Sequence, residues 1–150
     1  MWAKRGQQPQ VQSAPTQEKV AFSGFVNPLS GELLINECEH FNYETVMKSV
    51  EAFHGNLQED KKILVVLDNA SWHKKAVRII REESKFENIE FLFLPPYSPE
   101  LNPIERVWRI TRRERTHNHF FEKLHVLKTV LFKYFEGFKI PNAKLRTLCS

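Results

Sequence analysis

The clearest pattern of apolar positions lies near the middle of the chain. Ile63–Leu67 is an unbroken apolar run, which predicts a β-strand buried on both faces. A second apolar run, Ile89–Leu94, predicts another strand. Between the two runs, apolar residues recur at helical spacing and predict a helix near residues 72–84. The stretch therefore has the strand–helix–strand order that is typical of a parallel strand pair.

Further periodic segments flank this unit on both sides. Lys19–Asn27 and Glu32–Glu39 are two β-like runs separated by a turn rich in Asn, Pro and Gly, and they predict a β-hairpin. Tyr43–Phe53 has apolar residues at helical spacing. Downstream, a helix is predicted from Pro103 onward, and a last one over about residues 122–138. A hairpin followed by alternating helices and strands predicts a mixed α/β sheet.

Polar residues at the predicted helix starts can be explained as caps. Asn42 is placed to cap the helix that begins at Tyr43. The segment 68–71 offers Asp, Asn and Ser oxygens to the N–H groups of the next helix. Residues 102–105 have the pattern of a capping box, with Glu105 reaching back to Asn102. The carboxylates of Asp68 and Glu105 therefore each have a purely structural interpretation, as parts of helix caps.

The same two carboxylates also have a functional interpretation. Asp68 comes directly after the central strand, and Glu105 lies on the first turn of the helix after the next strand. The carboxyl ends of parallel strands lie at one edge of the sheet, where open α/β proteins bind their ligands. We therefore expect Asp68 and Glu105 to approach each other across one cleft.

Composition narrows the class of protein. A chain of 150 residues corresponds to one domain, and 41% apolar residues are enough to build a core. A net charge of +4 suits a polyanionic partner. We find no run near the roughly 20 apolar residues of a membrane span and no signal-peptide core. The two cysteines, Cys38 and Cys149, lack metal-type spacing, which favours a reduced cytoplasmic protein.

The motifs around the two carboxylates resemble a known family. These are Leu67-Asp68-Asn69-Ala70-x-x-His73 and Leu94-Pro95-Pro96-Tyr97-Ser98-Pro99-x-Leu101-Asn102-Pro103-Ile104-Glu105-x-x-Trp108, and 36 residues separate Asp68 from Glu105. The order and spacing resemble the C-terminal part of the catalytic domain of DDE transposases, most closely those of bacterial insertion sequences related to the mariner group.

This resemblance implies a fold and a chemistry. The fold is a ribonuclease H-like mixed sheet flanked by helices, and the activity is metal-dependent DNA strand cleavage and strand transfer during transposition. Asp68 would be the second catalytic Asp and Glu105 the closing Glu, and both would bind a two-metal site that holds Mg²⁺ or Mn²⁺. Asn69, His73 and Asn102 match positions beside these residues, where they would support the metal ligands or contact DNA.

A basic helix face follows Glu105. Arg109 and Arg112 lie four and seven residues after it on the same face, and Arg113 adds charge. Such a run usually marks a solvated helix surface. Because this one leads away from the expected metal site, we interpret it as a contact to the DNA backbone.

The sequence departs from the family pattern at its first acidic residue. The family uses three, the first of them on the first strand, whereas this chain has two Asp residues, Asp60 and Asp68, and Asp60 lies on the wrong side of the central strand. Residues 2–9 are similar to the loop that follows the missing strand, although their composition also suits a flexible tail. We therefore expect an N-terminally truncated catalytic domain that begins just after that strand.

These expectations divide the chain into three parts. Residues 1–17 would form a loop or tail, residues 18–121 the sheet and helices with both carboxylates, and residues 122–150 a C-terminal helix and tail. Two hypotheses about function stay open. The chain is either a transposase catalytic fragment that is inactive alone, or a non-catalytic remnant that binds only DNA or a transposase partner.

The expected partners and location follow from this. The expected partners are DNA (transposon ends and target) and either further copies of this chain or a complementing N-terminal transposase polypeptide. The expected location is the bacterial cytoplasm, with binding to the nucleoid when DNA is bound, and no membrane. Whether the chain is itself an enzyme stays open.

Overall fold

The described part of the chain folds as a mixed α/β structure. The computed structural model describes residues 10–13, 18–58, 61–117, 119, 121 and 123–149. Its strands are β1 (Gln10–Ser13), β2 (Glu18–Val26), β3 (Leu33–Cys38), β4 (Ile63–Leu67) and β5 (Ile89–Phe93). Its helices are α1 (Tyr43–Gly55), α2 (Ser71–Glu82), α3 (Pro103–Thr111), α4 (Leu124–Glu136) and α5 (Ala143–Cys149). A short 3₁₀ turn, η1 (Pro99–Leu101), precedes α3, and a wider π-helical turn, η2 (Arg112–Thr116), follows it.

The described strands form two separate sheets. One is antiparallel with the order β1-β2-β3, and the other is the parallel pair β4-β5. The predicted hairpin is confirmed as β2 and β3, with Val26 opposite Leu33 next to the turn. Strand β1 was not predicted, because residues 10–13 lie in the stretch expected to be a loop or tail. It pairs with the first half of β2, from Gln10 opposite Ala21 to Ser13 opposite Glu18.

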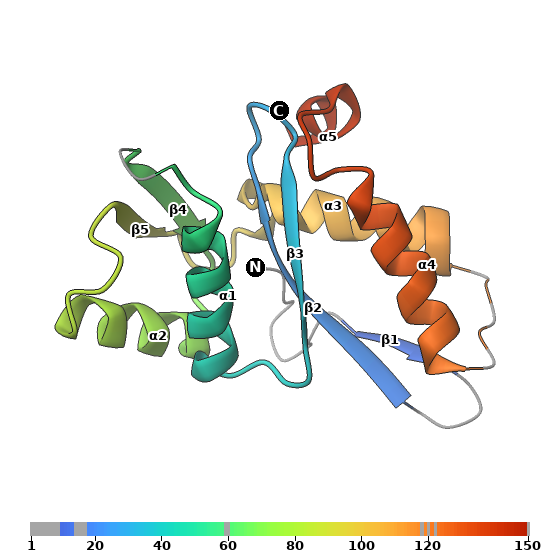
Figure 1. Cartoon of the computed structure of the whole chain (residues 1–150), viewed down its shortest axis with the longest axis horizontal. Helices are drawn as coiled ribbons and strands as arrows, with labels where there is room; N and C mark the ends of the chain where they lie inside the picture. Colours follow the sequence, from blue (N-terminus) through green and yellow to red (C-terminus); the bar gives the residue numbers. More distant parts are fainter. Residues whose placement is uncertain are drawn as a thin grey trace.

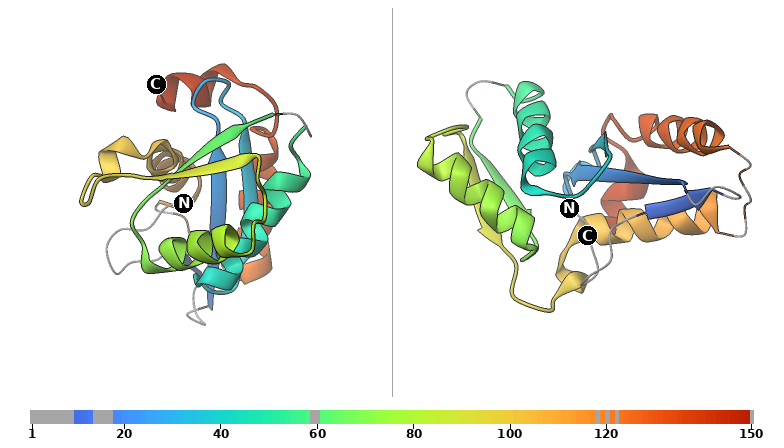
Figure 2. Two further views of the ribbon diagram at one scale, coloured as in Figure 1. Left: turned by 90° about the vertical axis from the view of Figure 1, so that its left-hand side faces the viewer. Right: turned by 90° about the horizontal axis from the view of Figure 1, so that it is seen from below.

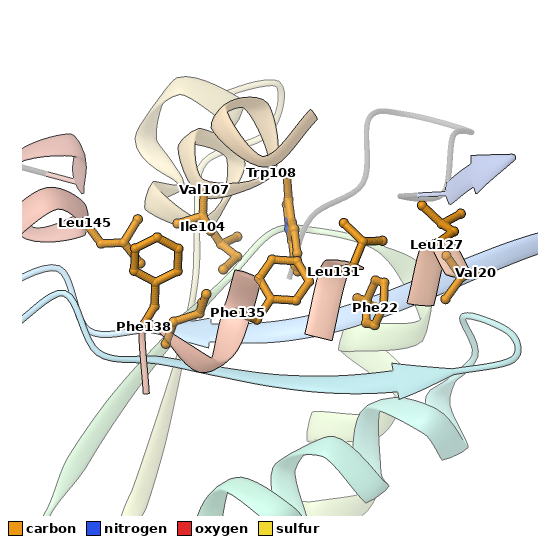
Figure 3. Packing of buried hydrophobic residues seen from close by; sticks show 11 residues of the cluster. Val20, Phe22, Ile104, Val107, Trp108, Leu127, Leu131, Phe135, Phe138 and Leu145 are labelled. Carbon is orange, nitrogen blue, oxygen red and sulfur yellow. The ribbon is translucent and has the colours of Figure 1, made fainter. Parts of the chain in front are cut away.

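Helices cover both faces of the central strand of the antiparallel sheet. Val20 and Phe22 point to one side of β2, where they pack with apolar residues of α3, α4 and α5 (Figure 3). Ala21 joins a second core on the other side, and the Ser23 hydroxyl lies 2.5 Å from the Ser49 hydroxyl of α1. Four successive side chains, Val20 to Ser23, are therefore at most 5% exposed.

The parallel pair is covered on one face. Figures 1 and 2 show β4 and β5 with α1 and α2 at one end of the molecule, and α3, α4 and α5 at the other. Val65 and Leu67 of β4 are buried in the core with α1 and α2. On the other face, Leu64 is 55% and Val66 37% exposed, and Leu92 of β5 is 53% exposed. The prediction that Ile63–Leu67 is buried on both faces is therefore wrong, because the covering helices lie on one side.

The predicted helices are present, and one further helix follows them. Asn42 caps α1 as predicted, and its side chain accepts a hydrogen bond from the Thr45 N–H at 2.9 Å. The unpredicted α5 lies in the expected C-terminal tail. Asn142 ties α5 to the hairpin by donating a hydrogen bond to the Gly31 carbonyl at 2.7 Å. Gly31 has φ 79°, and a Cβ at this position would collide with the Asn142 carbonyl, so both turn geometry and α5 favour glycine here.

No helix within the described ranges is long and apolar enough to cross a bilayer.

Candidate active site

Asp68 follows the last residue of β4. The parallel register places Leu67 opposite Phe93, and the Leu94 N–H donates a hydrogen bond to the Leu67 carbonyl at 2.7 Å. The side-chain amide of Asn69 donates to the Leu94 carbonyl and joins the two strand ends again. The backbone that carries Asp68 is therefore held in place from the neighbouring strand.

Two donors converge on one oxygen of Asp68. His73 Nδ1 lies 2.6 Å from Asp68 Oδ1, and the Ala70 N–H donates to the same oxygen at 3.0 Å. Burial alone would raise the pKa of Asp68, but these hydrogen bonds and the electrostatic effect of His73 outweigh it and lower the pKa below its ordinary value. Asp68 is therefore an ionised carboxylate at neutral pH, and its side chain is 24% exposed.

The structural interpretation of Asp68 as a helix cap is wrong. The residue at the cap position of α2 is Ala70, and α2 has no side-chain cap hydrogen bond. Asp68 instead accepts the N–H of Ala70 itself, which closes a turn before the helix begins. The carboxylate is thus positioned locally, but not in order to cap α2.

The predicted capping box at α3 is also wrong. Pro103 occupies the first turn as expected, but the side chain of Asn102 makes no capping hydrogen bond. The Glu105 N–H donates to the backbone carbonyl of Asn102, and the Asn102 N–H donates to the Pro99 carbonyl, because η1 runs directly into α3. Glu105 is half-buried on the first turn of α3, and Asn102 is 4% exposed. The expected role of Asn102, support of the metal ligands or contact with DNA, stays a prediction.

Comparison with known proteins decides the family. The model of the DDE superfamily endonucleases matches residues 1–128. The chain belongs to this family. It is 29% identical over 102 residues to an uncharacterized protein of Sinorhizobium fredii, a match that covers 66% of this chain and 70% of that protein.

A second relative connects this DDE superfamily chain with an insertion element. It is an uncharacterized 39 kDa protein of insertion element IS630 from Shigella sonnei, 28% identical over 123 residues. The match covers 79% of this chain but 34% of the relative, so the chain spans about a third of that protein's length. The resemblance to DDE transposases of bacterial insertion sequences is thereby confirmed.

Side chains that could bind a metal do not gather in the described part of this DDE superfamily chain. Within residues 10–13, 18–58, 61–117, 119, 121 and 123–149, no group of three or more His, Cys, Asp or Glu side chains could hold a metal. The approach of Asp68 to Glu105 stays a prediction. The loop expected at residues 2–9 and Asp60 lie outside the described residues.

The basic residues after Glu105 are exposed. Arg109, Arg112 and Arg113 are all exposed, and Arg112 and Arg113 belong to η2 rather than to α3. Burial lowers the pKa of Arg112, nearby Glu105 raises it and Arg109 lowers it again. Glu105 and Arg109 therefore lie near enough to Arg112 to affect it electrostatically, and the predicted common face stays a prediction. Arg106 points elsewhere and donates to the Leu148 carbonyl of α5 at 3.2 Å.

Sequence reasoning did not find the Asp68–His73 contact. His73 was recognised as a family position, but a spacing of five residues across a strand end and a helix start has no regular geometry that predicts contact. Ala70 was missed as well, since its contribution is a backbone N–H, which any residue except proline offers.

Proposed function

We propose that this chain is the catalytic portion of a DNA transposase that cleaves and joins DNA with the help of divalent metals. The observation that carries the proposal is the state of Asp68. Its carboxylate is ionised, held at the end of a parallel strand by hydrogen bonds to Oδ1, and partly open to solvent. Membership of the DDE superfamily and the insertion-element relative support it.

The residues present fit a hard divalent metal. Mg²⁺ and Mn²⁺ prefer oxygen ligands, and Asp68 and Glu105 both carry carboxylates. Asp68 and Glu105 would hold the metals. When bound, two metals activate the attacking hydroxyl or water and stabilise the leaving oxygen. The chain itself contributes the fixed orientation of Asp68, and Asn69 holds the strand ends on which this orientation depends.

A ribonuclease H-like arrangement and an additional acidic residue belong to the same proposal. That arrangement has a further strand between β2 and β4, which carries the first Asp. In the described part, β2 and β4 belong to different sheets, and β1 pairs with residues 18–21 of β2, so the further strand would pair with the rest of that edge of β2. With two of three acidic ligands, the metals would be loosely placed, and a misplacement of about 1 Å can cost about a hundredfold in rate. We therefore propose that the 150 residues alone do not cleave DNA.

Plasmid nicking in Mg²⁺ or Mn²⁺ tests this proposal. We expect no nicking by this chain alone, and metal-dependent nicking once the N-terminal region of a related transposase is added, fused or in trans. Asp68→Ala and Glu105→Ala should each abolish the restored activity, whereas Glu100→Ala, which removes an exposed carboxylate from η1, should not. Nicking by this chain alone that disappears in Asp68→Ala would show that the site is already complete.

A different result would favour the second hypothesis. If the completed protein binds DNA but does not nick it under any metal condition, the chain is a non-catalytic remnant that binds only DNA or a partner.

The exposed arginines define the proposed DNA contact. Arg109, Arg112 and Arg113 are exposed and add positive charge to the part of the chain that directly follows Glu105. Contacts to phosphates release counterions and do not read sequence. The double variant Arg109→Ala/Arg112→Ala should therefore weaken binding equally for unrelated DNA sequences and flatten its salt dependence by about 1 to 2 in the slope of log K against log salt.

Fluorescence anisotropy with labelled duplexes at several salt concentrations measures this slope. Arg78→Ala/Arg81→Ala is a matched control, because it removes the same charge from α2. Equal slopes for the wild-type protein and the Arg109/Arg112 variant would mean that these arginines do not contact DNA.

A further inference from the structure

The side chain of His73 is enclosed beside the proposed metal ligand. It lies on the first turn of α2, is 0% exposed and contacts Asp68 through Nδ1. A carboxylate offers acceptors alone, so the hydrogen of this bond belongs to Nδ1. Because the ring is buried, His73 does not reach a DNA phosphate, and of the two expected roles only support of the site is compatible with its position.

The surroundings of the other ring nitrogen agree with a supporting role. Nε2 is buried and has no hydrogen-bond partner in the described part of the chain. Within the described residues, the polar contacts of the His73 ring are thus confined to Asp68.

The two oxygens of Asp68 are consequently different. Oδ1 accepts hydrogen bonds from both His73 Nδ1 and the Ala70 N–H. No described residue donates to Oδ2, while the side chain as a whole is 24% exposed. The described donors therefore occupy Oδ1 and leave Oδ2 without a hydrogen bond from any described residue.

From this asymmetry we propose that His73 is a positioning residue that holds Asp68 by Oδ1 and so presents Oδ2 alone to a divalent cation. This inference rests on the proposed function. The donor of His73 restrains rotation of the carboxylate, in the way that hydrogen bonds around metal sites orient the ligating side chains. A packing role alone would require the volume of the ring but not its Nδ1–H.

Two variants separate the donor from the volume. Asn and Leu have nearly the same size and shape, but the Asn amide can donate from about the position of Nδ1, and Leu cannot. His73→Asn should keep the contact to Asp68, and His73→Leu should remove it. His73→Gln should also remove the contact to Asp68, because the longer side chain carries its amide closer to the position of Nε2.

Carbon NMR of the aspartate carboxyl groups measures the effect on Asp68. The chain has two Asp residues, Asp60 and Asp68, so ¹³C-labelled aspartate yields two carboxyl signals, which Asp68→Asn assigns. Titration with Mg²⁺ gives an affinity for each protein without any assay of cleavage. We expect wild type and His73→Asn to agree within about threefold, and His73→Leu and His73→Gln to bind about tenfold more weakly.

The outcomes distinguish the two levels of the proposal. Equal Mg²⁺ affinity in wild type and all three variants, or equal loss in all three, would overturn the positioning role of His73 and leave the metal site intact. An Asp68 signal of the wild-type protein that does not respond to Mg²⁺ would overturn the proposed metal site itself. If His73→Leu does not fold, as judged by its amide spectrum, the comparison of His73→Asn with His73→Gln gives the same decision.

Discussion

The two sheets differ in how completely they are covered. In β2, residues Val20 to Ser23 are at most 5% exposed, because α3, α4 and α5 lie on one face and α1 on the other. In β4, exposed and buried residues alternate, with Leu64 at 55% and Leu67 at 2%. The strand with the more apolar sequence is therefore the less buried of the two.

This difference shows that an apolar run indicates that a strand can be buried, but not which of its faces other elements cover. Ile63–Leu67 contains five apolar residues in succession, whereas β2 includes Lys19, Ser23 and Gly24. β2 is nevertheless the doubly covered strand, since helices from distant parts of the chain pack on both of its faces. The site, in turn, belongs to the half-covered pair, where Asp68 keeps access to solvent.

The largest expected difference between the two regions is in the loss of stability when a leucine is changed to alanine in each. Leu127 of α4 is 0% exposed in the core above β2, and Leu64 of β4 is 55% exposed. Leu127→Ala should lower the free energy of unfolding by about 2–5 kcal/mol, because it removes buried apolar area and leaves a cavity. Leu64→Ala should lower it by no more than about 1 kcal/mol, the range of strand preferences. Urea unfolding followed by circular dichroism measures both values.

A similar loss of stability in both variants would break the comparison. It would show that the outer face of β4 and β5 is packed in solution as tightly as the core around α4. Leu131→Ala, at a position that is 1% exposed in the same core, is a control for effects peculiar to Leu127.

A smaller effect is expected in the pH dependence of stability, which His73 of the half-covered region should influence. Burial lowers the pKa of His73 from its ordinary value of 6.5, and unfolding restores that value. The unfolded chain therefore binds more protons below pH 6.5, so stability is complete above this pH and is lost as the pH falls. His73 contributes a slope of at most about 1.4 kcal/mol per pH unit. The slope between pH 7 and 5 should be shallower in His73→Leu, as measured by urea unfolding at each pH.

Asp68 acts in the same direction at lower pH. Its folded pKa lies below the ordinary 3.8, so its stabilising contribution is present above that value and disappears as the pH falls through the folded pKa.

An unchanged slope between pH 7 and 5 in His73→Leu would show that the His73 ring accepts its proton equally well in the folded state.

Much of the site's backbone could be predicted, but its contacts could not. The motif positions of Asp68, Glu105 and His73 were recognised from residue order, and β4, α2 and α3 are elements of the predicted type. The cap assignments at both carboxylates were wrong. A capping pattern assumes that the first residues of a helix have no other hydrogen-bond partners. At α3, the preceding turn η1 uses the backbone groups that the capping box would have used.

The sequence by itself determined the local elements of this protein: the hairpin, the Asn42 cap of α1, and the placement of Asp68 directly after a strand. These follow from side chains and backbone groups a few residues apart. The tertiary structure alone decided that β2 is covered twice and β4 once, and that His73 donates to Asp68. Burial depends on segments that the whole fold brings together. The contact between Asp68 and His73 joins residues five positions apart, but it crosses the irregular turn between β4 and α2, which no helical or strand period encodes.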